Sequence, residues 1–147
     1  MVDELIAFFH ARLDEDERWA LAASPGPWSE NAESTEVLAV DGITVADGFA
    51  LSGNQLRATV AHIARHDPDR VLREVEAKRR ILDEHASEDG DCSACGRASW
   101  EENPGAYLRD EPEMADVWRP TIWPCRTARL LALPYADHPD YREKWKP

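Results

Sequence analysis

The residues best suited to chemistry in this chain are three cysteines and a histidine. Cys92 and Cys95 form a Cys-x-x-Cys pair, and Cys125 is the third cysteine of the 147 residues. Zinc prefers thiolate and imidazole ligands in a tetrahedral arrangement, and two ligands at this spacing fit one turn of chain around the ion. Because no second Cys-x-x-Cys pair exists, a histidine must complete the site. With His85 as that ligand, the spacing His-x6-Cys-x2-Cys-x29-Cys predicts one structural zinc ion.

The predicted site has one rival ligand and two rival interpretations. His138 is the alternative fourth ligand, and His85 is preferred because it lies nearer to the pair in sequence. The cysteines are alternatively unrelated buried thiols, or the pair is redox-active. A redox pair normally begins a helix directly after a strand, whereas here an acidic stretch precedes it. Asp89 and Asp91 in that stretch also disfavour a thiolate without a metal.

A second group of possible ligands consists of His62, His66 and Asp67. The two histidines share one face of an expected helix, at the spacing of the zincin motif, but Ile63 stands where that motif carries its general base. We favour a capping and packing role for these residues. The alternative is a second metal site that serves a small metal-dependent hydrolase. No catalytic residue is assigned, because the sequence contains neither a P-loop nor a Gly-x-Ser-x-Gly pattern.

Helices must position the candidate zinc ligands. Apolar residues at helical spacing predict about four helices, over residues 2–23, 53–66 and 67–86 and from residue 125 onward. Asp67 and Pro68 suit the N-cap and the first position of the third helix. His85 falls on the inward-facing stripe of that helix, in its last turn. We therefore expect the imidazole to lie beside the Cys-x-x-Cys pair.

The clearest strand signal surrounds Asp41-Gly42. This pair lies between two apolar runs, 37–40 and 43–46, and predicts a hairpin with a type I′ turn. Trp28 is a candidate start for a third strand. The chain is therefore predicted to be a single α+β domain over residues 1–147, with residues 87–125 as a zinc-knuckle segment. Zinc would hold the long acidic loop, 87–122, in place.

Composition limits the classes of partner and the location. The chain carries 29 acidic and 17 basic residues, a net charge of −12, so direct nucleic-acid binding is disfavoured. No apolar run approaches the roughly 20 residues of a membrane span. The first residues lack the basic start and cleavage site of a signal peptide. Together with the odd number of cysteines, this predicts a cytoplasmic protein.

Three of the six tryptophans, Trp100, Trp118 and Trp123, surround the predicted zinc site. The favoured interpretation is a small satellite core beneath the acidic loop. The alternative is an aromatic groove for a protein partner, because tryptophan is enriched at interface hot spots.

Two sequence blocks carry a family resemblance. The blocks are HIARHDPDRVLREVEAKRRILDEH, residues 62–85, and PCRTARLLALPYADHPDYREKW, residues 124–145. They resemble an uncharacterised family of small actinobacterial and actinophage proteins, catalogued as a domain of unknown function. The resemblance implies an actinobacterial or phage origin and a role in mobile-element biology or in its host. It implies no activity, substrate or catalytic residue.

Three classes of function compete on this basis. The leading hypothesis is a non-catalytic, zinc-stabilised accessory or protein-interaction module with a protein partner. An acidic decoy, which would inhibit a nucleic-acid-binding protein by occupying its surface, is the second. A small hydrolase that uses His62, His66 and Asp67 is the third.

Overall fold

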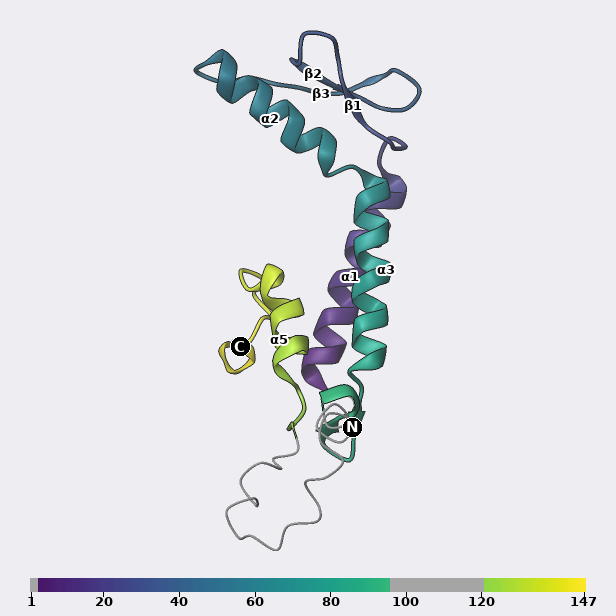
Figure 1. The fold of residues 1–147 in the computed structure, drawn as a ribbon, viewed down its shortest axis with the longest axis vertical. Helices are drawn as coiled ribbons and strands as arrows, with labels where there is room; N and C mark the ends of the chain where they lie inside the picture. The colour runs from purple at the N-terminus through teal and green to yellow at the C-terminus, as the bar shows by residue number, and fades with distance from the viewer. Residues whose placement is uncertain (1–2, 96–120) are drawn as a thin grey trace, which may run out of the picture. The chain divides into compact units, whose positions relative to one another are not determined.

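The protein has an α+β fold, as the sequence predicts. A computed structural model describes residues 3–95 and 121–147, which contain helices, a three-stranded antiparallel sheet and a two-stranded antiparallel sheet (Figure 1). The chain divides into two compact units, one formed by residues 11–77 and the other drawn from residues 1–10 and 78–147. Helices α1 (Glu4–Ala22) and α3 (Pro68–Glu84) contribute residues to both units. That residues 1–147 act as one domain stays a prediction.

The unit of residues 11–77 is built on the three-stranded sheet. Its strands β1 (Ser29–Glu30), β2 (Glu36–Leu38) and β3 (Thr44–Asp47) lie in the order β1-β2-β3. The strand predicted to start near Trp28 is thus β1. Helix α2 (Gly53–Arg65) supplies Val60 and Ala64 to a core with Val37 of β2. The hairpin around Asp41-Gly42 is therefore stabilised by packing against a helix.

The turn between β2 and β3 differs from its prediction. Gly42 has a φ of 81°, but Asp41 is not among the described residues with positive φ, so a type I′ turn is wrong. Instead, the Ala39 N–H donates to Ile43 O over 2.9 Å and the Gly42 N–H donates to Ala39 O over 2.9 Å. These bonds form a longer loop in which glycine alone takes the left-handed conformation. The Asp41 carboxylate accepts from the Ile43 N–H at 3.1 Å, which stabilises its ordinary φ.

Asp67 fixes the start of α3, as predicted. Its carboxylate is buried, with one oxygen accepting the Arg70 N–H at 2.8 Å and the other accepting the Trp28 N–H at 3.2 Å. Pro68 takes the first helical position, where its missing N–H costs nothing. Asp67 therefore joins the start of α3 to the segment that enters β1.

The second unit is packed around aromatic side chains. Phe8, in the first turns of α1, contacts the rings of Tyr141 and Trp145, with ring centroids 5.9 and 5.2 Å away. Trp145 belongs to a short 3-10 helix, η4 (Glu143–Trp145), and is buried. The unit also contains α5 (Arg126–Ala132), η3 (Leu133–Tyr135) and the strands β4 (Ser87–Glu88) and β5 (Asp91–Cys92). Within residues 3–95 and 121–147, every helix is too short or too polar to cross a bilayer.

Residues 87–92 correct the prediction of a continuous loop. They form the antiparallel pair β4–β5, whose connection is Asp89-Gly90. Both turn residues have positive φ, 51° and 91°, which is the type I′ geometry predicted for the other Asp-Gly pair. The remainder of the predicted loop falls mainly on residues 96–120, outside the described part of the chain.

Candidate metal centre

The four predicted ligands lie on three separate segments of the second unit. His85 directly follows the last residue of α3, and Cys92 is the last residue of β5. Cys95 lies in the helical residues 93–95 that follow β5, and Cys125 is the N-cap residue of α5. A helix end, a hairpin end and a helix start thus converge on one point.

The ligand atoms of these residues have the spacing of a tetrahedral zinc site. One atom from each residue lies within 4.8 Å of all the others. His85 Nδ1 lies 3.3 Å from Cys92 Sγ, and 3.6 Å from both Cys95 Sγ and Cys125 Sγ. Zinc bonds of about 2.3 Å to sulfur and 2.0 Å to nitrogen, at tetrahedral angles, require an N···S separation of about 3.6 Å. The four residues could therefore hold a metal ion without rearrangement.

The electrostatics of the thiols also favour a bound cation. Cys92 and Cys125 are buried, and all three cysteines are free thiols. Burial raises the pKa of Cys95 to about 12, and the hydrogen bond from Cys92 and the charge on Cys125 add to the effect. Three adjacent thiolates repel one another, so only a cation among them makes full ionisation favourable.

The same geometry bears on the redox alternative. Cys92 ends β5 and residues 93–95 are helical, so the pair lies at a strand-to-helix junction and not in the acidic loop that the sequence predicts. A redox pair needs two cysteines, whereas here a third thiol and an imidazole also lie within 4.8 Å of the pair. Four convergent ligand atoms are what a metal site requires. The cluster is therefore better suited to metal ligation than to thiol exchange.

Backbone hydrogen bonds hold the ligand segments together. The Cys92 N–H donates to Thr121 O and the Trp123 N–H donates to Gly90 O, each over 2.9 Å. Asp91 also forms an isolated antiparallel bridge with Ile122. The segment that leads to Cys125 therefore runs alongside the β4–β5 hairpin. The sequence analysis missed this hairpin, although Asp89-Gly90 is itself a turn signal.

The rival ligand His138 lies elsewhere in the same unit. Its ring packs edge-on against Phe8, with centroids 5.6 Å apart, and its Nδ1 accepts the Asp140 N–H at 3.1 Å. One group of three or more potential ligands occurs among the described residues, and His138 is not in it. The geometry therefore favours His85 as the fourth ligand.

His62, His66 and Asp67 do not form such a group in the described part of the chain. The histidine rings lie 4.3 Å apart, and His66 Nδ1 donates to His62 O over 2.7 Å, as expected at the end of a helix. Both oxygens of Asp67 accept backbone N–H groups, as described above. This arrangement matches the capping and packing role.

Of the tryptophans assigned to the site, Trp123 alone is described; Trp100 and Trp118 lie outside the described residues. Trp123 is buried, two residues before Cys125. The buried indole therefore belongs to the same segment as the candidate ligand Cys125.

Comparison with known proteins identifies the family. The chain belongs to a family of unknown function, DUF6221, which matches residues 2–147. This match confirms the resemblance to a family of unknown function. Among curated proteins and solved structures, none matches the chain significantly.

Proposed function

We propose that this protein is a non-catalytic module, stabilised by zinc, that binds another protein. The observation that carries the proposal is the spacing of His85 Nδ1 from the three Sγ atoms, 3.3 to 3.6 Å, which is close to the edge of a zinc tetrahedron. Three thiolates and one imidazole satisfy all four coordination positions. Zinc with no open position is structural, because neither water nor substrate can reach the ion.

Exposed apolar side chains support a protein partner. In the loop between β3 and α2, Phe49 is 87% exposed and Leu51 is 102% exposed. Val40 and Ile43, at the β2–β3 turn, are also largely exposed. Large apolar side chains that stay exposed in the folded protein are typical of surfaces that a partner covers.

The cellular setting belongs to the same proposal. Free thiols that hold zinc suit a reducing compartment, so we assign the protein to the cytoplasm. The family resemblance supports a role in actinobacteria or their phages, where the partner would be found.

Metal analysis of protein purified without added metal tests the zinc component. We expect one zinc per chain in the wild type and in His138→Ala, and loss of zinc in His85→Ala. If His85→Ala keeps its zinc and His138→Ala loses it, His138 is the fourth ligand and the assignment of His85 is wrong. Wild-type protein without zinc, with three freely titrating thiols, would contradict the proposal.

Affinity purification from the source organism tests the partner component. The double variant Phe49→Ser, Leu51→Ser should lose the partner, whereas Ala50→Ser, between the two positions, should retain it. Apolar contacts should survive salt well above physiological strength. Binding that collapses as the Debye length falls to about 8 Å would instead support the acidic decoy.

A further inference from the structure

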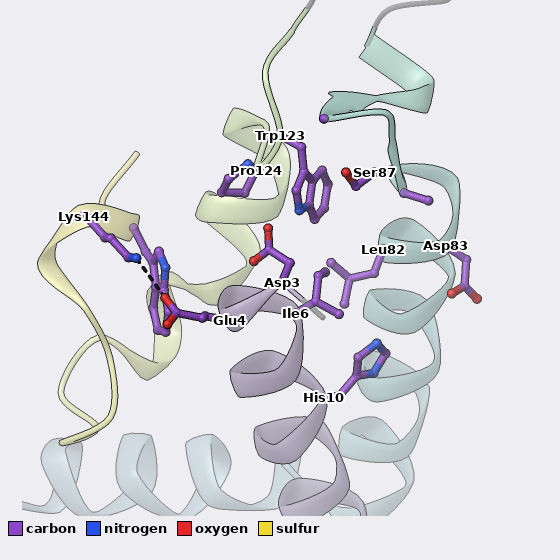
Figure 2. Close-up of a pocket in the computed structure, with 13 residues that line it drawn as sticks. Asp3, Glu4, Ile6, His10, Leu82, Asp83, Ser87, Trp123, Pro124 and Lys144 are labelled. Atoms are coloured by element: carbon purple, nitrogen blue, oxygen red, sulfur yellow. Dashed lines mark hydrogen bonds and ion pairs between the residues drawn. The ribbon is translucent and has the colours of Figure 1, made fainter. Parts of the chain in front are cut away.

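The second unit contains a pocket of about 920 Å³ beside the candidate metal centre. Its walls come from the first turns of α1, the last turns of α3, the β4–β5 turn, the segment before α5 and η4. Figure 2 shows the indole of Trp123 facing the space above Asp3, Ile6 and Leu82, whereas the Asp83 carboxylate lies beyond Leu82 and is directed away from Asp3. The pocket therefore combines apolar walls with carboxylates.

Trp123 contributes an unsatisfied donor to this pocket. Its side chain is 8% exposed, and its Nε1 has no hydrogen-bond partner among the described residues. A buried N–H without an acceptor is unfavourable, and such groups are rare in folded proteins. The indole therefore points to an acceptor that a ligand would supply.

The charge on the pocket walls is predominantly negative. Asp3 uses Oδ1 to accept the Leu5 N–H at 2.8 Å, and neither Asp3 nor Asp83 forms an ion pair within the described part of the chain. Glu4 is different, because Lys144 Nζ lies 2.9 Å from its Oε2 and neutralises it. Two carboxylates without an ion pair among the described residues thus line the pocket, Asp3 directly before α1 and Asp83 on α3.

We propose that this pocket binds the arginine or lysine side chain of a partner protein. The cation would bind the Asp3 carboxylate, with Asp83 adding negative charge at the edge of the pocket, and its aliphatic stem would pack on Ile6, Leu82 and the Trp123 ring. A backbone carbonyl of the partner would accept from Trp123 Nε1. This inference rests on the proposed function, because it names the chemistry of the partner.

Other ligand classes fit the pocket less well. A phosphate or carboxylate ligand would meet two like charges on a chain of net charge −12. An apolar ligand would bury the carboxylates without a partner, which is strongly unfavourable. A basic side chain satisfies the carboxylates, the apolar walls and the indole together.

The candidate metal centre supports one wall of this pocket. Trp123 donates its backbone N–H to Gly90, and each of these residues lies two positions before a candidate zinc ligand, Cys125 and Cys92 respectively. Without the metal, the segment that contains Gly90 and Cys92 would no longer be cross-linked to the segment that contains Trp123 and Cys125. We therefore expect the pocket to bind its ligand only in the metal-loaded chain.

Nuclear magnetic resonance of the full chain, with its zinc content measured in parallel, tests the proposal. The probes are acetyl-Gly-Arg-Gly-amide, its lysine analogue and its citrulline analogue, which has the shape of arginine without the charge. We expect a saturable shift of the Trp123 indole N–H resonance with arginine or lysine and none with citrulline. Equal shifts with citrulline, or no saturable shift with either basic peptide, would overturn the proposal.

Charge-neutral variants test the assigned residues. Asp3→Asn keeps the helix cap, since asparagine caps as well as aspartate, and Asp83→Asn changes an exposed side chain. Asp3→Asn should weaken binding of the arginine peptide about tenfold, as expected for a lost charged hydrogen bond, and Asp83→Asn should weaken it less, because this carboxylate only adds charge at the edge. Asp137→Asn, an exposed carboxylate outside the pocket lining, is the control with the same change of net charge. Equal weakening by all three variants would show nonspecific attraction and overturn the assignment.

The proposed function and this inference fail in different ways. If the chain holds one zinc but does not bind the basic peptides, the pocket proposal is refuted and the proposed zinc-stabilised module is unaffected. A metal-free chain that binds the arginine peptide with unchanged affinity supports the pocket but contradicts its dependence on zinc.

Discussion

The two Asp-Gly hairpins show how differently the two units are stabilised. Around Asp41-Gly42, β2 places Val37 in a core with two residues of α2, so the hairpin is held by burial of apolar surface. Around Asp89-Gly90, β4 and β5 are two residues each, and both residues of β4 are exposed. A short two-stranded hairpin without an apolar face is marginal in water. The first hairpin is stabilised by a core, and the second would be stabilised by the metal cross-link that we propose.

The largest effect is expected from removing a candidate zinc ligand. Cys125→Ser should abolish zinc binding and, with it, the hydrogen-exchange protection of the Cys92 and Trp123 amides. Apparent binding energies of structural zinc are about 10–16 kcal/mol, so few other interactions in the unit can replace it. The amides of β2, in contrast, should keep their protection. Equal loss of hydrogen-exchange protection in both hairpins would contradict the claim that the first is stabilised by an apolar core and the second by a metal cross-link.

A cavity in the apolar core should have the converse effect. Val37 is fully buried, and Val37→Ala should cost the three-stranded sheet about 2 kcal/mol through lost contacts and the cavity left behind. Thermal unfolding monitored together with zinc content separates the two units. We expect a lower midpoint with one zinc retained. Release of zinc by Val37→Ala would show that the units depend on each other.

Matched substitutions of the two turn glycines sharpen the comparison further. Gly42 and Gly90 have φ values of 81° and 91°, and an added Cβ would meet nothing within 4 Å of either. Alanine at each position should therefore cost only the backbone strain of the left-handed region, about 1–2 kcal/mol. Gly90→Ala should weaken zinc retention against a competing chelator, and Gly42→Ala should not. The same zinc affinity in both variants would contradict a role for the second turn in presenting the ligands.

The sequence predicted the parts of this molecule that have strong local signals. Helical spacing gave α3 an inward stripe on which Val75 and Leu82 are buried, and it placed His85 at the end of that stripe. The hairpin at Asp89-Gly90 was missed because Ser87 and Glu88 are polar, so no apolar alternation accompanies the turn. Its register depends instead on hydrogen bonds to residues 121–123, which are distant in sequence.

The pocket illustrates a second reason why the sequence was insufficient. Its walls come from α1, α3, the β4–β5 turn and η4, and no periodicity within one segment indicates that these meet. The sequence predicts that Trp123 belongs to a satellite core or to an aromatic groove, because it lies near the predicted zinc ligands and because tryptophan is enriched at interfaces. Its unpaired Nε1 becomes visible only when the surrounding atoms are in place.

The smallest expected effect concerns the surface contact that ties η4 to α1 in the second unit. A hydrogen bond from Lys144, aided by the nearby Arg142, lowers the pKa of Glu4 below its ordinary value of 4.5. A lowered pKa in the folded state means that the contact stabilises the unit above about pH 4.5, and that this contribution is lost as the pH falls through the folded-state pKa. Because Glu4 is solvent-exposed, the effect on stability should be small and sensitive to salt.

A carboxyl carbon titration should therefore show the pKa of Glu4 rising towards its ordinary value in Lys144→Gln. Lys146→Gln, which removes the partner of Glu143 instead, should leave the pKa of Glu4 unchanged. If both variants shift Glu4 equally, the contact is diffuse attraction between the acidic chain and its basic end, and η4 is held by the packing of Trp145 alone.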